Sequence, residues 1–190
     1  MTIRPNDRKL AELILFISER SEGDPRFGAA KLVRLLFYCD FQAFRMWKNS
    51  ITGQDYEMTE NGPAPRRLEN VRKFLVERGE LAIRKTEPLH KACDRTFALR
   101  SASLEEFTAE QIDLVSRMIL ENRENSAFRV KNIAEEIWGW QKADISETIP
   151  IEIAFISRRP PTEKERQRCL QDLPQAKVFF ARKAALLSDA

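Results

Sequence analysis

One stretch of the sequence, "KLVRLLFYCDFQAFRMW" at residues 31–47, constrains the fold more than any other. We expect a helix over residues 28–49, because at about 100° per residue its polar side chains fall into one narrow stripe. That stripe contains Lys31, Arg34, Tyr38, Gln42, Arg45 and Asn49. The remaining circumference is almost entirely apolar, and a helix with so much apolar surface is usually central to a hydrophobic core. We therefore expect the fold to be built around this helix.

Shorter elements are predicted before and after the long helix. Apolar residues at i, i+3, i+4 and i+7 predict a helix at residues 8–21. A Gly-containing turn after the long helix leads into an extended segment at 56–58. Alternating apolar and polar residues at 80–85 and 95–100 predict the two strands of a β-hairpin.

Prolines and capping residues indicate where further helices begin. Pro65 suits the first position of a helix that ends near Arg78, because proline has no N–H to leave unpaired there. Thr108 followed by Gln111 resembles a capping box at the start of another helix. The stretch "IPIEIAFIS" fits a strand and a buried helical turn equally well. Helical patterns also occupy residues 126–140, a stretch that begins at Thr162, and residues 175–187.

These patterns together predict a mainly α-helical α+β fold. Its parts are a helical core, a small β-hairpin or short sheet, and a helical C-terminal extension. A length of 190 residues suits one domain with an extension. We place the main domain at residues 1–157 and the extension at 158–190, with "RRPP" at 158–161 marking the boundary.

The reactive side chains do not form a recognisable catalytic or metal-binding pattern. The one histidine, His90, falls in a predicted loop, and we interpret it as a surface residue. The sequence has no phosphate-binding loop, no glycine-rich nucleotide motif and no CxxC pair among its three cysteines. We therefore expect a binding protein that is not an enzyme and that uses no cofactor and no metal.

Composition also indicates where the protein works. An odd number of cysteines without a CxxC pair argues against a disulfide framework and favours a reducing, cytoplasmic compartment. The N-terminus lacks a signal-peptide pattern, and no stretch reaches the ~18 apolar residues of a membrane span. The net charge of +3 is too small to indicate a nucleic-acid-binding protein by itself.

Asp40 lies on the apolar side of the long helix, opposite its polar stripe. A buried carboxylate is costly unless it is paired, so we expect it to accept hydrogen bonds from the proline turn that follows or from the two arginines after it. The residues of this predicted latch are Asp40, Gly62, Pro63, Pro65, Arg66 and Arg67. The alternative is that Asp40 lies in water at the flank of the helix.

The polar stripe of the long helix carries basic residues that suit an acidic partner surface or nucleic-acid phosphates. The candidate partner-binding residues are Lys31, Arg34, Tyr38, Arg45 and Tyr56. The alternative is an ordinary solvated helix face.

The order of three helices followed by a hairpin also suggests a winged-helix DNA-binding regulator. In that interpretation the residues on the recognition helix would be Arg66, Arg67, Asn70 and Lys73. However, a helix-turn-helix uses a turn of about 3–4 residues, whereas here a far longer segment separates the second and third predicted helices. DNA binding is therefore the alternative function.

Three motifs occur in order and at similar spacing to those of a known family. The residues that carry them are Lys31, Leu32, Leu35, Leu36 and Tyr38, then Thr52, Gly53 and Tyr56, then Gly62, Pro63 and Pro65. Together they resemble the SocA-like antitoxin family, whose domain is called Panacea. Asp40 also fits many members, and "EIWGWQKADISETIPIEIAFI" is similar to a second, weaker block of the family. The resemblance covers about residues 8–157.

The resemblance implies a non-enzymatic protein of a two-gene toxin–antitoxin system, of a kind often found near prophage genes. Such antitoxins neutralise protein toxins by direct protein–protein binding. The implied partner is a cognate toxin encoded by an adjacent gene, and operator DNA and a second copy of the chain are further candidates. The shared domain would be the common platform, and the C-terminal helices are candidates for choosing the toxin.

Overall fold

The computed structural model describes residues 5–60, 62–86, 93–123 and 143–155, together with 162–164, 166, 167 and 171. The chain divides into two compact units, Met1–Ser157 and Arg158–Ala190. The helices and strands named below all belong to the first unit. In the second unit the Arg166 N–H donates to the Thr162 carbonyl, a helical hydrogen bond of 2.9 Å.

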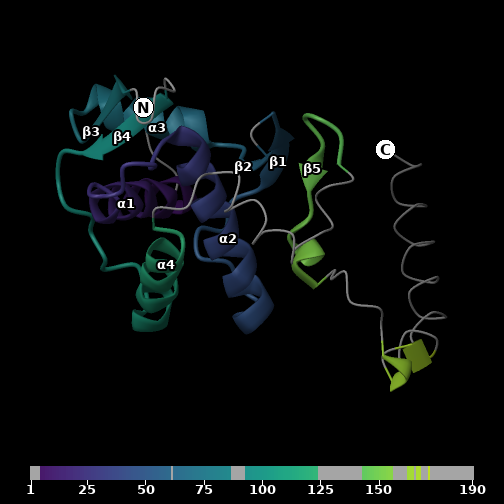
Figure 1. Ribbon diagram of the computed structural model, residues 1–190. Helices are drawn as coiled ribbons and strands as arrows, with labels where there is room; N and C mark the ends of the chain where they lie inside the picture. The colour runs from purple at the N-terminus through teal and green to yellow at the C-terminus, as the bar shows by residue number, and fades with distance from the viewer. Residues whose placement is uncertain are drawn as a thin grey trace. The chain divides into compact units, whose positions relative to one another are not determined.

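The first unit is mainly helical with small antiparallel sheets, so the predicted α+β class is confirmed (Figure 1). Its helices are α1 (Pro5–Arg20), α2 (Ala29–Trp47), α3 (Leu68–Glu77), α4 (Ala109–Glu121) and the 3₁₀ helix η4 (Ile151–Phe155). Its strands are β1 (Tyr56–Thr59), β2 (Gly62–Pro65), β3 (Leu81–Thr86), β4 (Cys93–Ala98) and β5 (Thr148–Ile149).

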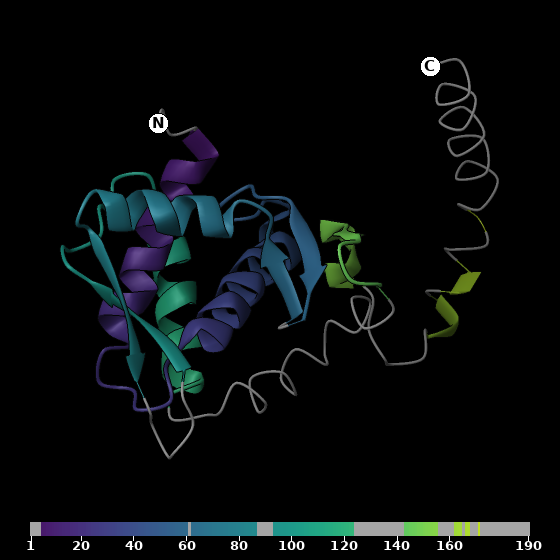
Figure 2. The ribbon, with the colours of Figure 1, turned by 90° about the horizontal axis from the view of Figure 1, so that it is seen from above.

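Helix α2 is central, as its apolar circumference predicts. It contacts α1, α4, β2, β4 and η4, and in Figures 1 and 2 the β3–β4 hairpin and the β1–β2 pair lie on opposite sides of it. The helix starts after an extended Gly28 and stops at Lys48, which adopts a left-handed conformation with φ 60°. The Lys48 N–H donates to the Phe44 carbonyl at 2.9 Å and so closes the last turn.

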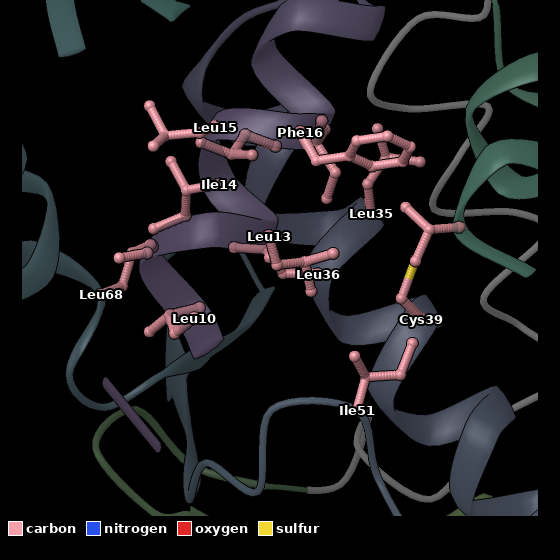
Figure 3. Close-up of a cluster of buried hydrophobic side chains, with 14 of the residues drawn as sticks. Leu10, Leu13, Ile14, Leu15, Phe16, Leu35, Leu36, Cys39, Ile51 and Leu68 are labelled. Carbon is pink, nitrogen blue, oxygen red and sulfur yellow. The ribbon is translucent and has the colours of Figure 1, made fainter. Parts of the chain in front are cut away.

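The largest hydrophobic core joins α1 to α2 (Figure 3). Figure 3 labels Leu10, Leu13, Ile14, Leu15 and Phe16 from α1, Leu35, Leu36 and Cys39 from α2, and Ile51 and Leu68 from nearby segments. Truncating a leucine in such a core to alanine costs about 2–5 kcal/mol. A second cluster forms where aromatic side chains of α2 meet β1, β5 and η4.

The first sheet explains an incorrect prediction about Pro65. Its strand order is β2-β1-β5, so β2 is an edge strand, and Pro65 pairs with Tyr56 of β1. Pro65 was predicted to begin a helix, but α3 starts at Leu68. An edge strand tolerates a residue without an N–H just as a helix start does.

The second sheet confirms the predicted hairpin. Strands β3 and β4 pair antiparallel from Leu81 with Ala98 to Thr86 with Cys93. The turn before β3 uses Gly79 at φ 68°, a conformation that glycine adopts without strain. The Ser18 and Thr96 hydroxyls hydrogen-bond at 2.9 Å in the interior and connect α1 to β4.

The remaining predictions divide into confirmed and untested ones. The capping box of Thr108 and Gln111 is present at the start of α4. The stretch at 149–157 contains the end of β5 and then η4, so it is both a short strand and a helical turn. The helices predicted at 126–140 and 175–187 lie outside the described residues.

Candidate functional site

Asp40 lies in the interior of the domain, with no exposed surface. One carboxylate oxygen accepts the backbone N–H of Thr52 at 2.7 Å, and the other lies 2.8 Å from the Tyr56 hydroxyl. The Thr52 hydroxyl also donates to this second oxygen. The expectation that Asp40 points inward is therefore correct, and the alternative of a solvated position is excluded.

Burial raises the pKa of Asp40, although the hydrogen bonds from Thr52 and Tyr56 act in the opposite direction. Burial and the neighbouring Asp40 together raise the pKa of Tyr56. The pKa of the buried Cys39 thiol is also raised, first by burial and then by Asp40. These three side chains thus share a dry environment in which each negative charge is disfavoured.

Hydrogen bonds continue from Asp40 to the surface. The Gln54 N–H donates to the Thr52 hydroxyl at 3.3 Å, and the Gln54 side-chain amide donates to Asp7 at 3.2 Å. Asp7, at the start of α1, also accepts from the Arg67 guanidinium at 3.1 Å. This chain of bonds, from Asp40 through Thr52 and Gln54 to Asp7 and Arg67, is called the polar network below.

The polar network corrects the predicted latch. Asp40 was expected to bind the proline turn or an arginine, but its partners belong to the loop after α2 and to β1. Arg66 instead bonds to Glu57 at 3.1 Å and to Thr148 at 2.9 Å. Hydroxyl and backbone donors from the loop after α2 and from β1 satisfy the carboxylate of Asp40. Its burial therefore requires no guanidinium in the core.

The proline turn is nevertheless connected to Asp40 through one strand. Gly62, Pro63 and Pro65 lie on β2, which pairs with β1 along its whole length. Tyr56 of β1 contacts Asp40 and pairs with Pro65. Thr52 and Tyr56 follow Asp40 by 12 and 16 residues and lie in other elements. Helical and strand periodicity therefore could not identify them as its partners.

Two members of the predicted basic stripe are not on the surface. Lys31 is 2% exposed and forms an ion pair with Asp24, which also accepts the Arg26 N–H at 2.9 Å. Tyr38 is buried in the aromatic cluster of α2. The prediction of a solvated or partner-binding stripe is therefore wrong at both positions, since a partner cannot reach them.

The other predicted partner-binding residues differ in accessibility. Tyr56 is buried beside Asp40, with its ring edge-on to Phe41 at a centroid distance of 5.1 Å. Arg34 is partly buried, one of its terminal nitrogens has no hydrogen-bond partner within the described part of the chain, and burial lowers its pKa. Arg45 is exposed in the last turn of α2. Of the five predicted contact residues, Arg45 is the one that is exposed.

The family model described as "Antitoxin SocA-like, Panacea domain" matches residues 32–141. The chain belongs to this family. The match covers more than half of the chain and includes Asp40, Thr52, Tyr56 and Arg67 of the polar network. No curated protein and no solved structure gives a significant match to the chain.

A cavity of about 310 Å³ opens on the Panacea domain near α1 and α3. Its lining residues are Arg8, Ala11, Glu12, Phe74, Leu75, Arg78, Glu80 and Arg100. Arg100 donates to both oxygens of Glu12, at 2.7 and 2.8 Å, and to Glu80 at 2.7 Å. Its donors therefore connect α1 to the second sheet, and we interpret the cavity as a structural junction.

The charges of this junction stabilise one another. Burial acts to raise the pKa of Glu12, but the hydrogen bonds from Arg100 and Ser103 outweigh it, so the pKa lies below its ordinary value.

Among the described residues, no group of three or more His, Cys, Asp or Glu side chains has a metal-binding arrangement. No helix within the described residues is long and apolar enough to cross a membrane.

Proposed function

We propose that this Panacea domain is an antitoxin that neutralises a cognate protein toxin by direct, non-enzymatic binding in the cytoplasm. The observation that carries the proposal is the family match over residues 32–141. The partner in this proposal is the protein encoded by the adjacent gene.

The interior of the domain supports a role as a rigid binding platform. The polar network and the ion pair of Lys31 with Asp24 hold the loops on both sides of α2. Buried polar groups with satisfied hydrogen bonds favour a single arrangement of the backbone. A platform of this kind presents the same surface to a partner without reorganisation, which reduces the entropic cost of binding.

We assign the platform to residues 1–157 and a toxin-selecting role to residues 158–190. The division of the chain into two compact units at the same boundary supports this assignment. Its test is the removal of residues 158–190, which should leave a folded domain with reduced rescue of growth. Full rescue by the shortened chain contradicts the selecting role.

The alternative of a winged-helix DNA-binding regulator has less support. A hairpin of β1 and β2 separates α2 from α3, where a helix-turn-helix has a tight turn. Arg66 and Arg67, two of the predicted recognition residues, form ion pairs with Glu57 and Asp7. We therefore treat binding to operator DNA only as an alternative outcome of the experiment described next.

The test is to express the protein of the neighbouring gene alone and then together with this chain. We expect growth arrest in the first case, rescue in the second, and co-purification of the two proteins. Absence of toxicity, or rescue without a physical complex, contradicts the proposal. A gel shift of the upstream DNA that weakens with salt indicates the DNA-binding alternative.

A further inference from the structure

The C-terminal end of α2 exposes aromatic and apolar side chains. Met46 is 48% exposed, Trp47 37% and Phe155 of η4 47%. The other large exposed apolar side chains of the described residues are dispersed along the chain: Val76, Ile83, Leu99, Leu120 and Ile145. Met46 lies about 160° around the helix from Phe44 and so on its opposite side. Trp47 and Phe155, which lie on the Phe44 side, together indicate a contact surface more strongly than a single exposed residue does.

Ring contacts and helical spacing place the members of this surface side by side. The Phe44 and Phe155 rings lie 5.6 Å apart, and the Lys48 ammonium lies 3.7 Å from the centre of the Phe155 ring. At about 100° per residue, Trp47 lies about 60° from Phe44 on one side of the helix and Arg45 about 100° from it on the other. Lys48, which ends the helix in a left-handed conformation, is placed by its contact with the Phe155 ring. We call Phe44, Arg45, Trp47, Lys48 and Phe155 the α2-end patch.

The patch is positively charged at one margin. Arg45 and Lys48 are exposed, and within the described part of the chain neither forms an ion pair with a carboxylate. By contrast, Arg66, Arg67 and Arg100 are all paired with acidic side chains. The charge of the α2-end patch is therefore available to a partner.

We propose that the α2-end patch binds an acidic, amphipathic segment of the partner protein. An apolar anchor of that segment would pack against Trp47 and Phe155, and its carboxylates would meet Arg45 and Lys48. Tryptophan and arginine are enriched among the residues that dominate binding energy at protein interfaces. Opposite charges around an apolar contact also accelerate association and select the partner. This inference rests on the proposed function and identifies the surface that performs it.

The chain offers matched variants for the test. Arg45→Glu with Lys48→Glu reverses the charge of the patch, and Trp47→Ala removes its apolar anchor. The charge control is Arg84→Glu with Lys85→Glu, because both residues are exposed on β3 and Arg84 also lies over an aromatic ring.

The control for Trp47→Ala is Val76→Ala, which removes an exposed apolar side chain from α3. Thermal unfolding of each variant shows whether it remains folded.

The probe is the purified protein of the neighbouring gene, with titrations at low and high salt. Each patch variant should weaken binding by about tenfold or more, as expected for a residue that dominates an interface. The charge variant should also reduce the salt dependence of the affinity. The two controls should bind like the unmodified chain.

The outcomes separate this inference from the proposed function. If the unmodified chain binds the probe and the folded patch variants bind equally well, the patch is not the contact surface and the inference is overturned. If the unmodified chain does not bind or rescue, the proposed function fails and the inference falls with it. If the patch variants lose affinity for upstream DNA while binding to the probe is unchanged, the acidic protein segment is the wrong partner.

Discussion

Two parts of the same helix differ in how their polar side chains are used. In the first and middle turns of α2, Lys31 and Asp40 are buried and satisfied by Asp24, Thr52 and Tyr56. In the last turn, polar and aromatic side chains are exposed to solvent. The comparison shows that charged residues of one central helix are buried where neighbouring loops supply partners and stay exposed where they do not, and at the exposed end we propose that they contact a partner.

The largest expected effect comes from breaking the buried ion pair. Replacing Lys31 with methionine leaves Asp24 as an unpaired buried charge, and we expect a loss of about 3–5 kcal/mol in the free energy of unfolding. Urea denaturation measures this loss. A second substitution, Asp24→Asn, in the same chain should recover part of it, and a Lys31→Met protein as stable as the unmodified one contradicts the fastening role.

A smaller loss is expected from removing one hydroxyl beside Asp40. Tyr56→Phe keeps the ring against Phe41 but removes the hydroxyl that meets Asp40 and the Leu36 carbonyl. We expect a cost of about 1–3 kcal/mol, the range for a buried polar group left without its partner. The same urea measurement applies, and a Tyr56→Phe variant as stable as the unmodified chain contradicts the Asp40 contact.

A pH-dependent effect of up to about 1.4 kcal/mol per pH unit is expected from Asp40. Because burial raises the pKa of Asp40 in the folded chain, the native state binds more protons than the unfolded state above the ordinary aspartate pKa of about 3.9. The contribution of Asp40 to stability is therefore fully present below pH 3.9 and is lost as the pH rises through the folded pKa.

Asp40→Asn removes this titration. Relative to the unmodified chain, the asparagine variant should become progressively more stable over the pH range above about 3.9, as measured by urea denaturation at several pH values. A stability difference that is constant across this range contradicts a raised pKa for Asp40.

The smallest change in stability is expected at the exposed end of the helix. Arg45→Ala should change the free energy of unfolding by no more than about 0.5 kcal/mol, as is usual for exposed positions, while weakening partner binding. Thermal unfolding and a binding titration of the same preparation check both parts. A large loss of stability would show that Arg45 fastens the fold as Lys31 does, and the contrast between the two parts of α2 would disappear.

The sequence predicted well where periodicity carries the information. The expected helix at 28–49 corresponds to α2 at Ala29–Trp47. The helical wheel also correctly predicted that Asp40 points inward. The hairpin of β3 and β4 and the capping box of α4 were predicted for the same reason, since strand alternation and capping chemistry are local.

The sequence failed where burial depends on distant partners. Lys31 lies in the polar stripe of the helical wheel, which predicts a solvated position. The ion pair with Asp24, from the turn between α1 and α2, offsets the cost of burying its charge. Pro65 was misassigned because an edge strand and a helix start both accept a missing N–H. The partners of Asp40 were missed because a buried carboxylate can be satisfied either by a guanidinium or by hydroxyl and backbone donors. The sequence does not show which of these lies beside it.

Hydrogen–deuterium exchange of this chain with and without the protein of the neighbouring gene tests the central claim most directly. The claim is that the buried middle of α2 holds the scaffold while its exposed end binds the partner. We predict new protection at residues 44–48 and 151–155 in the complex and unchanged, already strong protection around Thr52 and Tyr56. New protection confined to other surfaces, with exchange at the end of α2 unaltered, would contradict the claim.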